Sequence, residues 1–68
     1  DSARRLLEEA EDADEYGRPV DEVDAAALRA MATSEERGQA DPGDDYDLLP
    51  LARLVVARLE RQMGEGVR

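Results

Sequence analysis

Two groups of neighbouring carboxylates are the side chains in this sequence whose type and spacing suit chemistry. They are Asp12, Asp14 and Glu15, and Asp44, Asp45 and Asp47. Oxygen ligands at close spacing suit a hard cation such as Ca²⁺. Neither group has the alternating Asp or Asn ligands, the central Gly and the distant Glu of an EF-hand loop, and the second group is also typical of a helix start. We therefore expect no metal site.

Paired carboxylates can also act as general acid and base in glycoside hydrolysis. That chemistry needs a cleft that holds the pair at a set separation and raises the pKa of one member. Here the acids are expected on convex helix faces, and the chain has no His and no Cys, so a histidine base and a thiol nucleophile are both excluded. A phosphate-binding loop and a cofactor signature are also missing. The sequence predicts a protein that is not an enzyme and binds no cofactor.

Length and charge limit the class of protein further. The chain has 68 residues with 18 acidic and nine basic side chains, for a formal charge of −9. It fits one small domain of residues 1–68. The longest apolar runs are far shorter than the roughly 18 residues of a membrane-spanning helix, and no signal peptide is recognisable, so we expect a cytoplasmic protein. Abundant Ala and Arg without Lys, Asn or Ile is typical of a GC-rich bacterial genome, and a chain that starts at Asp1 suggests a domain excised from a larger protein.

The elements that position these side chains are expected to be three helices. Turn-forming residues cluster at 17–19 and 38–43, and Ala, Leu, Glu and Arg dominate the rest. The pattern predicts an all-α, compact three-helix domain with helices at about 2–15, 19–37 and 47–63. Helix starts at Pro19 and after Asp44, Asp45 and Asp47, and a stop at Gly38, follow from their terminal preferences. The third helix should be central, since its apolar band is about 160° wide.

The first helix is expected to be amphipathic, with an acidic outer face. Small and apolar residues fall within one arc at about 100° per residue, and the acids lie opposite them. That face carries Arg4 together with Glu8, Glu11, Asp12 and Glu15.

Two leucines lack an evident place in the core. Leu28 lies about 110° from the centre of the apolar arc of the second helix, and Leu54 lies between Arg58 and Arg61 on the third. Lone exposed leucines are normal on protein surfaces. The alternative is that both belong to an apolar patch that docks a partner or a second copy of the chain.

Charge is divided unevenly along the chain. Residues 1–47 carry 16 acids and five arginines, whereas residues 48–68 carry two acids and four arginines. We expect the acidic part to shield or contact the basic third helix.

The acidic face has three interpretations. It is a solvated surface, a surface that steers a basic protein partner, or a mimic of the phosphates of DNA. Direct binding to nucleic acid is disfavoured, because phosphate neutralisation requires a basic surface.

The most favoured function is a non-catalytic protein-binding module: an acidic inhibitor, an antitoxin-like neutraliser or an accessory subunit that acts on a basic protein. An oligomerisation or docking domain from a larger protein is the alternative, and a DNA mimic is the second alternative. The residues expected to bind the partner are Glu8, Glu11, Asp12, Glu15, Leu28, Leu54, Arg58 and Arg61. Neither a membrane nor nucleic acid is an expected partner.

Overall fold

A computed structural model describes the backbone of residues 2–67 and the side chains of residues 2–62. This part of the chain forms four helices and no strand: α1 (Ser2–Tyr16), α2 (Glu22–Met31), α3 (Ser34–Ala40) and α4 (Leu49–Val67). The all-α prediction is confirmed for these residues. The predicted number of three helices is wrong, because the segment expected as one helix at 19–37 forms α2 and α3.

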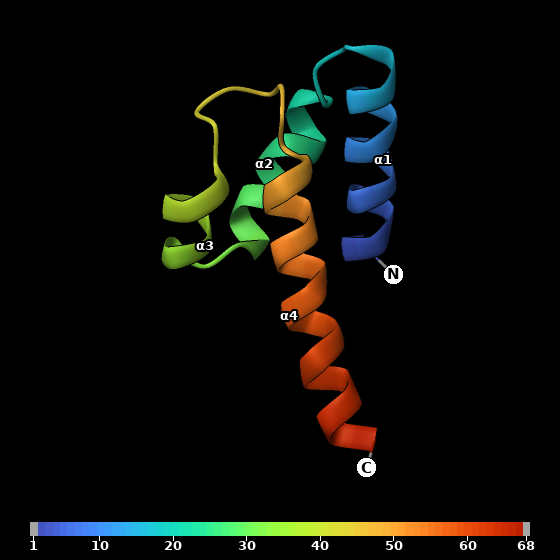
Figure 1. The fold of residues 1–68 in the computed structure, drawn as a ribbon, viewed down its shortest axis with the longest axis vertical. Coiled ribbons are helices and arrows are strands. Elements are labelled where there is room, and N and C mark those ends of the chain that lie inside the picture. The colour runs from blue at the N-terminus through green and yellow to red at the C-terminus, as the bar shows by residue number, and fades with distance from the viewer. Residues whose placement is uncertain (1, 68) are drawn as a thin grey trace.

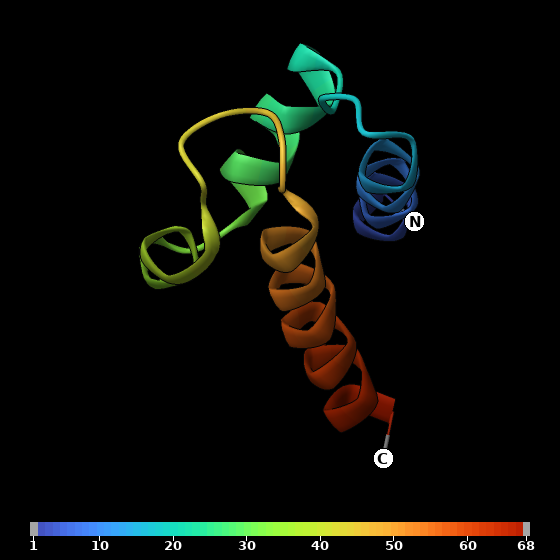
Figure 2. The same ribbon diagram turned by 45° about the horizontal axis from the view of Figure 1, so that its top comes forward.

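The helices are arranged around the first half of α4. Figure 1 shows α1 antiparallel to α4 on one side and α3 on the other, and the turned view in Figure 2 keeps them on opposite sides. Helix α2 packs against both α1 and α4. The second half of α4 extends beyond the other helices (Figure 1). The C-terminal helix is therefore central over its first turns only.

The core is built mainly from alanine, leucine and valine. All the residues buried in the described part are apolar, and none is polar or charged. Small residues allow the helices to approach closely, but each buries little apolar surface. The core cluster consists of Leu6, Ala10, Ala13, Val20, Ala25, Leu28, Ala32, Leu48, Leu51, Ala52 and Val55.

Helix α1 ends at Tyr16, one residue later than the predicted end at residue 15. Gly17 has a positive φ of 67°, a conformation that suits a residue without Cβ. The N–H of Arg18 donates to the carbonyl of Ala13 at 2.9 Å, which is the long bond of a Schellman motif. This cap satisfies a carbonyl that the helix itself leaves unpaired.

The junction between α2 and α3 is a capping box. The Thr33 hydroxyl accepts from the N–H of Glu36 at 3.1 Å, and the Glu36 carboxylate accepts from the N–H of Thr33 at 2.9 Å. Gly38 does not end the helix as expected. Helix α3 continues through Gly38 to Ala40, where the N–H of Asp41 donates to the carbonyl of Arg37 at 3.0 Å.

The loop between α3 and α4 is held in place by Arg29 of α2. Arg29 donates to the carboxylates of Asp41 and Asp45, each at 3.1 Å, and to the carbonyl of Asp44. Asp44 itself accepts from the N–H of Tyr46 at 3.0 Å. These aspartates were expected to cap the last helix, but Asp44 and Asp45 bond within the loop and to Arg29 instead.

Helix α4 begins close to its predicted start and ends later. Pro50 lies in its first turn, where its missing N–H leaves no helical bond unmade. The predicted stop at residue 63 is wrong, because the helix passes through Gly64 to Val67. Glycine weakens a helix without excluding it. Among the described residues, no helix has the length and apolar character needed to cross a bilayer.

Candidate functional site

The outer face of α1 is the most acidic surface that one helix presents. Glu8, Glu11, Asp12 and Glu15 are all exposed, as the sequence predicts. The opposite side of α1 buries Ala3, Leu6, Ala10 and Ala13, so packing fixes which side faces outward. We call the four exposed acids the α1 acidic face. Its carboxylates make no ion pair within the described part of the chain.

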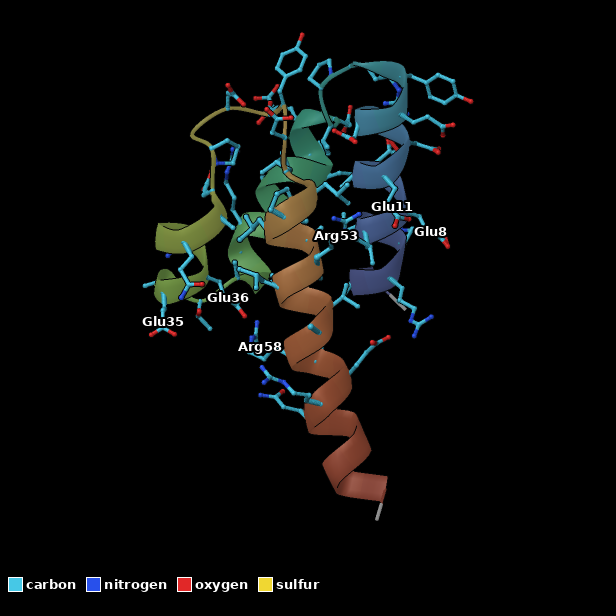
Figure 3. The ribbon with its side chains drawn as sticks, viewed as in Figure 1. Glu8, Glu11, Glu35, Glu36, Arg53 and Arg58 are labelled. Atoms are coloured by element: carbon cyan, nitrogen blue, oxygen red, sulfur yellow. The ribbon has the colours of Figure 1, made fainter. Side chains whose placement is uncertain are left out.

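Elsewhere, five acidic side chains pair with arginines in the described part of the chain, whereas other acids, among them Glu22 and Glu35, have no ion pair there. Arg18 donates to Glu9 at 3.2 Å, and Arg4 at the start of α1 pairs with Glu60 of α4. Arg29 binds the α3–α4 loop, and Arg58 binds Glu36. Figure 3 shows Glu8 and Glu11 on α1, well apart from the Arg58–Glu36 pair on the far side of α4. The α1 acidic face thus brings together four carboxylates that have no ion pair among the described side chains.

A groove lies where the α1 acidic face meets α4. It has a volume of about 280 Å³ and is lined by Arg4, Leu7, Glu8, Glu11, Val56 and Glu60. Val56 is buried and Leu7 is half-buried, whereas the four charged residues are exposed. The groove therefore has apolar side chains at its base and charged side chains around its opening. The lining residues come from α1 and α4. The apolar ones, Leu7 of α1 and Val56 of α4, lie at the edge of the apolar face of their helix.

Sequence reasoning found half of this groove. The helical pattern placed Glu8 and Glu11 on one face of α1, but it could not say which part of α4 lies beside them. Leu7 was assigned simply to the apolar side of the helix. The sequence LLEE at residues 6–9 carries the only available signal, because a leucine followed directly by acids marks the edge of an apolar face.

Leu28 is not a surface residue. Its side chain is only 1 % exposed and belongs to the core cluster. The expectation was wrong because the predicted apolar arc relied on Val23 and Ala30, which are both exposed. The predicted start of this helix at Pro19 was also wrong. Asp21 instead caps α2 by accepting from the N–H of Val23 at 3.2 Å, so Val20 lies before the helix. The buried stripe of α2 then runs through Ala25 and Leu28.

Leu54 and the two arginines of α4 lie in different environments. Leu54 is half-buried and lies outside the core cluster. Arg58 is half-buried: it donates to Glu36 at 2.9 Å and to the carbonyl of Met31 at 2.8 Å. It thereby joins α4 to α3 and to the last residue of α2. Arg61 is exposed. The structure brings none of these residues into the groove beside the α1 acidic face.

The internal ion pairs alter the titration of two acids. The guanidinium of Arg58 is the largest influence that holds the pKa of Glu36 below its ordinary value, and the N–H of Thr33 adds to it. The N–H of Gly43, followed by Arg29, lowers the pKa of Asp41. Both carboxylates are therefore committed to holding α3 and the following loop in place, and neither resembles a catalytic acid with a raised pKa.

The two acidic groups considered at first as metal ligands do not converge. In the described part of the chain, no three carboxylates come together in an arrangement that could hold a metal ion.

Neither models of known protein families, nor curated proteins, nor solved structures gave a match to this chain.

Proposed function

We propose that this chain is a non-catalytic module that binds a basic protein through the α1 acidic face. The observation that carries the proposal is that four acids gather on one exposed face of α1. The arginines at positions 4, 18, 29 and 58 pair with other acids, while Glu8, Glu11, Asp12 and Glu15 share one exposed face without internal partners in the described residues. A field of one sign raises the encounter rate with an oppositely charged protein.

The acids of this face lower the stability of α1, and this loss of stability supports a role beyond solubility. Asp12 and Glu15 lie in the second half of α1, near the negative end of the helix dipole, and no basic residue occupies its last turn. Such charges weaken a helix. Placing acids at the opposite end would give the same net charge without this penalty. Residues that violate folding preferences are expected at functional surfaces.

The docking alternative has lost one of its supports. It relied on the wide apolar band of the last helix together with Leu28 and Leu54, and Leu28 is buried in the core. A second copy of this acidic chain would also be repelled by the first at low salt. A basic protein is the partner that the charge of this surface fits best.

The test compares two variants that carry the same change in net charge. The first neutralises the α1 acidic face: Glu8→Gln, Glu11→Gln, Asp12→Asn and Glu15→Gln. The control neutralises four acids outside it: Glu22→Gln, Asp24→Asn, Glu35→Gln and Asp47→Asn. Proteins captured from the source cells by the unmodified chain are identified, and their affinities for the three chains are measured by titration calorimetry at two salt concentrations.

We expect a captured basic protein to bind the first variant about tenfold or more weakly, since four exposed ion pairs contribute roughly 0.2–1 kcal/mol each. The control should bind nearly as the unmodified chain does. The first variant should melt at the same temperature or higher, which shows that it is folded. Equal losses for both variants, or capture of acidic proteins alone, would contradict the proposal. Competition by duplex DNA would identify the module as a DNA mimic.

A further inference from the structure

The groove between α1 and α4 has the chemistry of a receptor for one long basic side chain. Its apolar lining is the buried Val56 and the half-buried Leu7, and its charged lining is exposed: three carboxylates and one guanidinium, from Glu8, Glu11, Glu60 and Arg4. Lysine and arginine have a matching construction, because each carries a cationic head on an aliphatic stem that prefers apolar contacts. A flat acidic surface would attract charge, but only a groove of this composition also recognises the stem.

The size of the groove supports a single side chain as its occupant. Its volume of about 280 Å³ lies near the lower end of the roughly 300–1,000 Å³ of ligand pockets, which leaves room for one long side chain. The structure also supplies an internal analogue of the occupant. Arg4 lines the groove and pairs with Glu60 across the two helices. One of the groove carboxylates is thus already occupied by a guanidinium.

We propose that this groove receives a lysine or arginine side chain of the basic partner, with the stem on Leu7 and Val56 and the cation among Glu8, Glu11 and Glu60. This inference rests on the proposed function and makes it specific. It divides the α1 acidic face into two parts: Glu8 and Glu11 contact the inserted side chain, whereas Asp12 and Glu15 contribute only a general field. Arg4 competes with the partner for Glu60.

The test uses the unmodified chain and two synthetic peptides at pH 6. One is a hexapeptide of lysine, and the other is a hexapeptide of 2,4-diaminobutyric acid, which has the same number of amino groups on stems two methylenes shorter. Binding is followed by amide chemical shifts in NMR titrations. We expect the lysine peptide to bind about fivefold or more tightly, since each buried methylene adds to affinity. Its shifts should be concentrated at residues 7–11 and 56–60.

Two pairs of variants provide matched controls. Glu8→Gln with Glu11→Gln should weaken lysine-peptide binding about threefold more than Asp12→Asn with Glu15→Gln, which removes the same charge from the same helix. Arg4→Gln should bind the peptide more tightly than Arg5→Gln, because both remove one positive charge from α1 but only Arg4 lies in the groove.

The outcomes separate the groove from the proposed function. Equal affinity for the two peptides, with equal effects of the paired variants, would overturn the groove and leave the acidic face as a binding surface. No binding of either peptide at low salt would overturn both. The peptide comparison uses the unmodified chain, so a variant that fails to fold does not decide the result.

Discussion

At the scale of single residues, three arginines each connect segments of the chain that are distant in sequence. Arg29 holds the α3–α4 loop through Asp41 and Asp45, Arg58 joins three helices, and Arg4 bridges α1 and α4. Arginine suits this work because its fixed fork of donors binds several acceptors at once. The acids of the α1 acidic face lack such a partner in the described residues, and they are distinguished by lying together on one exposed face of a single helix.

The two leucines that lacked a place in the sequence pattern should now differ in their effect on stability. We expect Leu28→Ala to lower the free energy of unfolding by about 2–4 kcal/mol, because it leaves a cavity in the core. Leu54→Ala should cost about 1 kcal/mol or less, since this side chain is half-buried. Urea unfolding followed by circular dichroism measures both. Similar losses for the two variants would mean that Leu54 also belongs to the core.

At the scale of helices, the sequence predicted where helix forms better than where it breaks. Residues 2–15 were placed within one residue of α1, because Gly17 is an unambiguous stop. The break at Ala32 was missed although Thr33 and Glu36 have the spacing of a capping box. Helix-forming residues on both sides concealed it. The predicted apolar face of α2 missed Leu28 because it relied on Val23 and Ala30, which are exposed.

The same limit applies to the candidate site. Periodicity within α1 sufficed to predict its acidic face, because that face depends on one helix alone. The groove could not be predicted, since it depends on which turn of α4 lies beside Leu7, and that register is set by packing of residues far apart in sequence.

The capping box at the α2–α3 junction provides a test at this scale. Thr33→Ala removes the hydroxyl that accepts from the N–H of Glu36 and should lower the free energy of unfolding by about 1 kcal/mol. Ser34→Ala changes an exposed neighbour within α3 and serves as the control. Thermal and urea unfolding compare the two variants. If Thr33→Ala is as stable as the control, the capping box does not stabilise the break between the helices.

At the scale of the whole molecule, the internal ion pairs predict how stability responds to acid. The pKa values of Asp41 and Glu36 are lowered in the folded chain, so both prefer to be ionised there more than in the unfolded chain. Their stabilisation is fully present above the ordinary carboxyl pKa of about 4. It is lost as the pH falls through the lowered values, because protonation then breaks the bonds to Arg29 and Arg58.

Substitution separates this effect from the titration of the other acids. Asp41→Asn and Glu36→Gln should be less stable than the unmodified chain at pH 6, and the difference should shrink toward pH 3. Asp12→Asn removes one negative charge outside both ion pairs and serves as the control. Urea unfolding at a series of pH values provides the measurement. A difference that stays constant with pH would show that the ion pairs do not drive the acid sensitivity.

The antiparallel pairing of α1 with α4 has a consequence for the energetics of recognition. The groove has one wall on each helix, and residues 17–48 separate these helices in the sequence. It exists only while α1 is docked on α4. Any ligand of the groove therefore binds the docked arrangement and not the open chain, so its free energy of binding is added to the stability of that arrangement. Recognition and the docking of α1 on α4 are then linked equilibria.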